Sequence, residues 1–130
     1  MHDKSDYWLD ICEEDISAAN ALLQSNRLLW AGFITHLIVE KALKALIANK
    51  TGKVPPKIHH LPRLAKIAGV FDELSDDQKS LLRKLMPLHI EARYPEYKRM
   101  VNSTLTYESS KQLLKEAEEF LCWTKKKLGK

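Results

Sequence analysis

The segment from Leu28 to Asn49 constrains the fold more than any other part of the chain, because apolar side chains cover most of its circumference when it is drawn as a helix. These side chains are Trp30, Phe33, Ile34, Leu37, Ile38, Ala42, Leu43, Leu46 and Ile47. A helix with so little polar surface must be surrounded by other parts of the protein. Its polar residues His36, Glu40 and Lys44 follow one another at four-residue spacing and form one narrow strip. That strip could face solvent, a partner subunit or a polar site.

The remaining patterns supply helices that can surround this segment. Residues 5–24 and the segment after Thr106 have apolar stripes at three- and four-residue steps, and residues 61–68 form a shorter helix. Another helix begins at Ser75, whose capping-box partner is Gln78, and Pro87 should kink it. No useful strand-like alternation occurs. The sequence therefore predicts an all-α protein, an antiparallel up-and-down four-helix bundle with one additional short helix, in a single domain of residues 1–130.

Several features bear on location and chemistry. No apolar run is long enough to span a membrane and the first residues do not resemble a signal peptide, so we expect a cytoplasmic protein. Cys12 and Cys122 are expected to be buried thiols rather than a disulfide. Glycine-rich phosphate loops, zinc-protease motifs and esterase elbows are missing, and no cofactor or metal is predicted. Adjacent side chains rarely converge on one ion, so His59 and His60 are interpreted as structural residues near a helix start.

Charge is distributed unevenly along the chain. Residues 1–26 hold six acidic residues and only one lysine, whereas residues 50–66 hold five lysines and arginines and no acid. Residues 79–99 are also basic, with six bases against two acids. The basic segments could bind phosphate or an acidic partner surface. They could equally form a solvated face that the acidic first helix balances.

The stretch HIEARYPEYKRM, residues 89–100, combines groups suited to a nucleotide. Pro95 should end the helix just after Arg93, which lies four residues beyond His89. Guanidinium groups bind phosphate bidentately, tyrosine rings stack on bases, and histidine transfers protons near neutral pH. The candidate binding residues are Arg93, Tyr94, Tyr97, Lys98 and Arg99. Ion pairs between Arg93 and nearby acids would explain the same stretch without a ligand.

The order of these segments resembles the HEPN domain family over roughly residues 5–127. The resemblance rests on YWLDICEEDISAANALL, LWAGFITHLIVEKALKALIANKTG, HHLPRLAKIAG and, above all, EARYPEYKRM. It implies a four-helix bundle with a short extra helix, commonly a homodimer. It also implies a partner, a minimal nucleotidyltransferase with which such proteins can form a toxin–antitoxin pair, and binding of nucleotides or RNA.

The catalytic members of that family are metal-independent ribonucleases with an arginine followed, after four to six residues, by histidine. Arg93 matches the arginine by its place before Tyr94-Pro95, but no histidine follows it. Arg83 and His89 have the right separation, which we interpret as a coincidence because six helical positions place side chains about 120° apart. The sequence thus favours nucleotide or RNA binding in a basic groove. The alternatives are a ribonuclease that uses His89 and Arg93, and a non-catalytic protein-interaction module.

Overall fold

The structure is a computed structural model and describes residues 4–91 and 105–130, apart from the side chains of residues 90 and 91. The helices, in chain order, are α1 (Lys4–Gln24), α2 (Leu28–Thr51), α3 (Leu61–Ile67), the single 3-10 turn η1 (Phe71–Glu73), α4 (Asp76–Glu91) and α6 (Tyr107–Lys127). The described residues form no strand. The predicted all-α helical bundle is therefore confirmed.

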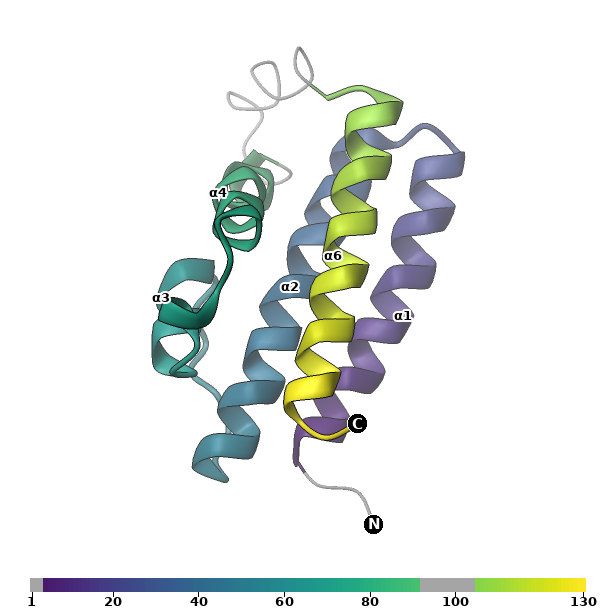
Figure 1. Cartoon of the computed structure of the whole chain (residues 1–130). Helices are drawn as coiled ribbons and strands as arrows, with labels where there is room; N and C mark the ends of the chain where they lie inside the picture. The colour runs from purple at the N-terminus through teal and green to yellow at the C-terminus, as the bar shows by residue number, and fades with distance from the viewer. Residues whose placement is uncertain (1–3, 92–104) are drawn as a thin grey trace.

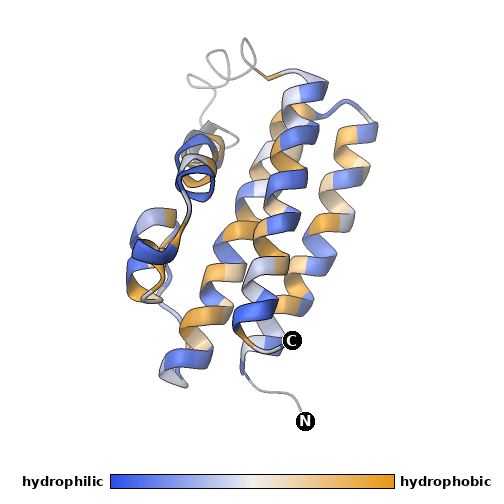
Figure 2. Cartoon of the chain, in the orientation of Figure 1, coloured by the Kyte–Doolittle hydropathy of each residue, from blue (hydrophilic) through white to orange (hydrophobic). Residues whose placement is uncertain are grey.

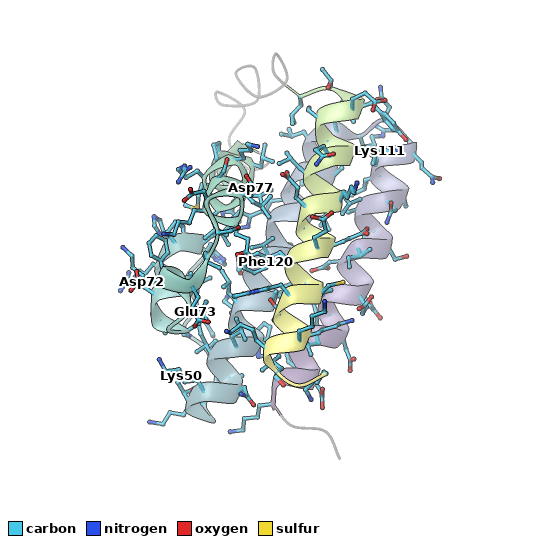
Figure 3. The ribbon with its side chains drawn as sticks, in the orientation of Figure 1. Lys50, Asp72, Glu73, Asp77, Lys111 and Phe120 are labelled. Carbon is cyan, nitrogen blue, oxygen red and sulfur yellow. The ribbon has the colours of Figure 1, made fainter. Side chains whose placement is uncertain are left out.

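Helices α1, α2 and α6 form the main packing unit (Figure 1). α1 and α2 are antiparallel and joined by a tight turn in which Asn26 adopts a positive φ of 61°. α6 runs antiparallel to α1 and in the same direction as α2. Residues of α2 such as Ile38 and Leu43 are fully buried, as the nearly all-apolar sequence requires. Phe120 of α6 is 1% exposed and points into the interior (Figure 3). Figure 2 shows mixed polar and apolar bands along α1 and α6, which are the amphipathic outer helices.

The predicted helix ends agree with the hydrogen bonds. Ser75 and Gln78 exchange side-chain and backbone hydrogen bonds of 2.9 and 3.1 Å, and Thr106 forms a capping box with Ser109. Gly52 ends α2 in the left-handed conformation, with φ of 68°. These local contacts satisfy backbone groups that a helix end leaves unpaired, so they fix where each helix begins or ends.

Helices α3 and α4 form a second layer against α2 (Figure 1). The helix α4 continues through Pro87 to Glu91, so this proline lies inside the helix rather than at its end. α4 approaches α2 closely at Gly32, where an added Cβ would lie 3.0 Å from a methyl group of Leu88. η1 was not predicted, since three residues are too few to show a period. The second layer brings the end of α4 over the polar strip of α2.

Three acidic residues of α1 pair with lysines of α2 and of the C-terminal part of the chain. Asp15 binds Lys41 at 2.9 Å, and Glu13 forms an ion pair with Lys125. Asp6 binds Lys130 at 2.6 Å. Within the described part of the chain, no ion pair uses a lysine or arginine of residues 50–66. The acidic first helix therefore does not balance this basic segment through direct contacts.

The two cysteines differ in burial. Cys12 lies in the interior, where its thiol is 3.5 Å from the carbonyl oxygen of Ile38, and burial raises its pKa to about 12. Cys122 is exposed, so the expectation that both thiols are buried is wrong for this residue. Leu121 faces the core, and a helix turns about 100° per residue, which directs the next side chain outward. Both thiols are free, as predicted.

Among the described residues, no helix combines the length and the apolar character needed to cross a membrane.

Candidate functional site

The polar strip of α2 is buried inside the protein. His36, Glu40 and Lys44 are 0%, 3% and 6% exposed. Of the three surroundings that the sequence left open, a polar site within the chain is the one that the structure provides, because other polar side chains of the protein meet the strip. Buried ionisable groups are costly unless they are paired, so these contacts are the first clue to a site.

Glu40 is the centre of this cluster. Its carboxylate accepts a hydrogen bond of 3.1 Å from the Lys44 ammonium group, one helical turn along α2. The Nδ1 atom of His59 lies 3.0 and 3.1 Å from its two oxygens, and Nδ1 of His36 lies 3.6 Å from Oε1. His59 comes from the loop between α2 and α3, so Glu40 joins that loop to the bundle.

His59 and His60 have different roles although they are adjacent. The ring of His60 caps α3 by accepting a 3.1 Å hydrogen bond from the backbone N–H of Arg63, so its predicted structural role is confirmed. The ring of His59 turns the other way, toward Glu40, and its side chain stays 45% exposed. His59 is therefore the point at which the buried cluster reaches the surface.

His89 adds a third imidazole from α4. Its ring centre lies 4.5 Å from that of His59 in a stacked arrangement and 4.8 Å from that of His36. Phe33 covers the cluster, with a ring centre 5.5 Å from that of His89. Three histidines from α2, the loop and α4 thus surround one carboxylate.

His36 is neutral at ordinary pH. Burial lowers its pKa to about 3, and the neighbouring His89, His59 and Lys44 add to the shift because a second positive charge would be repelled. Within the described residues, neither of its ring nitrogens makes a hydrogen bond of normal geometry, although the backbone of His59 lies near the ring and partly opposes the lowering of its pKa. Unpartnered buried polar atoms cost free energy, so an imidazole in this position calls for an explanation beyond packing.

Of the candidate site residues predicted from the sequence, His89 alone lies in the described part of the chain. The predicted binding residues Arg93, Tyr94, Tyr97, Lys98 and Arg99 lie outside the described residues. His89 faces the cluster, whereas Arg83, six residues earlier on α4, is exposed.

The sequence analysis missed the convergence of Glu40, His59 and His89. One atom of each residue could serve as a metal ligand, and these three atoms lie within 4.8 Å of one another. The available signal was the polar strip in an otherwise apolar helix. It could not indicate which distant side chains would meet it.

Comparison with known proteins defines the class of molecule to which this bundle belongs. The HEPN domain family matches residues 5–128, which covers α1 through α6. The chain therefore belongs to the HEPN domain family, as the sequence resemblance suggested. HEPN domains are typically RNA-related and often pair with nucleotidyltransferases. No curated protein and no solved structure matches the chain significantly.

Proposed function

We propose that this HEPN domain binds the phosphate groups of a nucleotide or of RNA in a basic groove beside the histidine cluster. The observation that carries the proposal is the stacked contact between His59 and His89. It joins two basic segments that are distant in sequence, the loop and α3 within residues 50–66 and the end of α4. Lys57 and Arg63, which are close to His59 in the sequence, are both exposed.

Arg93 and the residues after it follow directly from the end of α4. In the proposed complex, the Arg93 guanidinium holds phosphate, Tyr94 or Tyr97 stacks on a base, and Lys98 and Arg99 attract the polyanion. Within the described residues, the lysines and arginines of residues 50–66 have no acidic partner, which supports the proposal, since these cations keep their charge available for phosphate.

The test compares two exposed lysines in a polarisation assay with a labelled single-stranded oligoribonucleotide. Lys57 lies in the basic loop, whereas Lys111 lies on α6 and extends away from α3 and α4 (Figure 3). Lys57→Ala should weaken binding several-fold and reduce the salt dependence by about one counterion. Lys111→Ala should leave the affinity unchanged. Equal effects of the two substitutions, or an unchanged affinity in Arg93→Ala, would contradict binding of the oligoribonucleotide in this groove.

A second candidate function is metal-independent cleavage of RNA with His89 and Arg93. The observation that favours it is a histidine pair beside a carboxylate, an arrangement that can hold an imidazole in one tautomer for proton transfer. Incubation with single-stranded RNA and EDTA distinguishes the two candidates. Cleavage that is lost in His89→Ala supports the ribonuclease, and intact RNA together with tight binding supports the binding protein.

The family also suggests the proposed setting of the protein, a cytoplasmic homodimer paired with a minimal nucleotidyltransferase in a toxin–antitoxin-like system. A role as a non-catalytic interaction module belongs to the same setting. Co-purification with a nucleotidyltransferase encoded beside this protein tests it. A complex that forms normally with Arg93→Ala would separate the interaction from phosphate binding.

A further inference from the structure

We propose that Glu40, His59 and His89 bind a divalent transition-metal ion of the zinc class. The three donors come from three separate elements, α2, the loop before α3, and α4, and their ligand atoms lie within 4.8 Å of one another. A metal ion at this point would join the second layer of the fold to the main bundle. The proposal departs from the expectation of no metal that the sequence suggested, and it does not depend on binding of RNA.

The donor set fits such an ion. Two imidazole nitrogens and one carboxylate oxygen form a ligand set that suits zinc, cobalt and nickel. Calcium and magnesium sites instead use oxygen ligands. Bonds of about 2.0–2.2 Å in a tetrahedral site place ligand atoms roughly 3.3 Å apart. Nδ1 of His59 is already 3.0 and 3.1 Å from the Glu40 oxygens. Binding then requires rotation of the stacked His59 and His89 rings, so that both ring planes contain the ion.

His36 provides an independent indication. Its ring is fully buried, its two nitrogens make no hydrogen bond of normal geometry within the described residues, and Nδ1 lies 3.6 Å from Glu40. Side chains that hold metal-binding carboxylates in place often do so by hydrogen bonds. A small movement of Glu40 toward a metal would let His36 make such a bond.

The position of His59 gives the ion a route into the cluster. Its side chain is 45% exposed, and it lies on a loop rather than within a helix. The ring can therefore turn without disturbing the core, and the ion can enter from solvent. An open fourth position would be filled by water, as in sites with three protein ligands.

Lys44 opposes metal binding. Its ammonium group lies 3.1 Å from Glu40, so it neutralises the carboxylate that the ion needs. The same group lies 5.7 Å from the centre of the Trp8 ring, a cation–π contact that could retain it once an ion displaces it. Removal of this competing charge should therefore strengthen metal binding, which a purely structural ion-pair network would not do.

The experiment uses the full chain without an affinity tag, stripped with EDTA and titrated with Zn²⁺ by calorimetry and with Co²⁺ by visible absorption. We expect one ion per chain and the intense absorption of low-coordinate Co²⁺. His59→Ala should weaken affinity at least tenfold, and Lys44→Met should strengthen it. His60→Asn is the matched control, because it removes the adjacent histidine and keeps a capping acceptor for α3.

Glu40→Gln serves as a second ligand variant, and circular dichroism establishes which variants fold. If Glu40→Gln fails to fold, the exposed His59 still tests the site. Lack of stoichiometric Zn²⁺ or Co²⁺ binding by the unmodified protein overturns the proposal. So does an equal loss of affinity in His59→Ala and His60→Asn. Because these titrations contain no RNA, their failure leaves the proposed phosphate groove unaffected.

Discussion

The two sides of α2 are buried to a similar degree but by different chemistry. On the face opposite the polar strip, residues such as Ile38, Ala42 and Ala45 pack against other apolar side chains, and the carbonyl of Ile38 contacts Cys12 of α1. Toward the loop and α4, His36, Glu40 and their partners form a desolvated polar cluster. Apolar burial stabilises a fold directly, whereas the desolvation penalty of buried charges is often as large as their mutual attraction. The comparison indicates that the first side holds the bundle together and the second serves a site.

The largest predicted effect is the loss of the central carboxylate. Glu40→Ala leaves Lys44 buried without its anion and should destabilise the protein by about 3–5 kcal/mol, measured by urea unfolding. Adding Lys44→Met to this variant should recover most of that loss, because no unpaired charge remains. On the apolar side, Ile38→Ala should cost about 2–5 kcal/mol, and Lys44→Met should not rescue it. Rescue of both variants, or of neither, would contradict the distinction.

The second prediction concerns pH and the metal-free protein. The pKa of His36 falls from 6.5 to about 3 on folding, so below pH 6.5 the unfolded chain binds the additional proton. Stability from this group is therefore complete above pH 6.5 and is lost as pH falls toward 3, by about 2 kcal/mol at pH 5. His36→Leu should remove this dependence while changing stability at pH 7 by less than about 1 kcal/mol.

Other titratable groups face His36 and must be separated from it. They are Glu40 and Lys44 on α2, His59 on the loop and His89 on α4. Unfolding curves for the unmodified protein and His36→Leu, recorded in EDTA from pH 7.5 to 4.5, give the difference that belongs to His36. Parallel stability curves for the two proteins would assign the pH dependence to the neighbours instead.

The smallest predicted effect is on thiol reactivity, which reports how closed the apolar side is. Cys12 has a thiol pKa of about 12 and is buried beside Ile38, whereas Cys122 is exposed. At pH 8, a disulfide reagent such as DTNB should modify one thiol rapidly in the native protein and two after unfolding. Cys122→Ser should remove the rapid phase. Rapid reaction of Cys12 would show that the apolar side opens readily.

Much of the fold could be predicted because it depends on local patterns. The period of apolar residues located the helices, and capping residues such as Ser75, Thr106 and Gly52 fixed several of their ends. The apolar circumference of α2 predicted that other helices surround it, which the structure confirms. Burial within one turn was harder to judge, as Cys122 illustrates, since neighbouring positions on a helix can differ completely.

The candidate site was less predictable because its residues meet only through tertiary packing. His59 appeared to be one of two equivalent loop histidines, and only the path of the loop assigns one to α3 and the other to Glu40. His89 appeared to belong with Arg93, whereas α4 also brings it to His36. The period of a helix cannot show which face of a different helix will contact it. The roles of residues 93–99 remain predictions.

The loop that carries His59 contains Pro55 and Pro56, and this pair has a consequence for binding. Each proline restricts the backbone of the unfolded chain, and Pro55 is itself buried. A flexible loop would lose conformational entropy when its histidine engaged an ion or a phosphate. This loop loses much of that entropy when the protein folds, so a ligand at His59 meets a partner that is already ordered, and association requires less ordering of the chain.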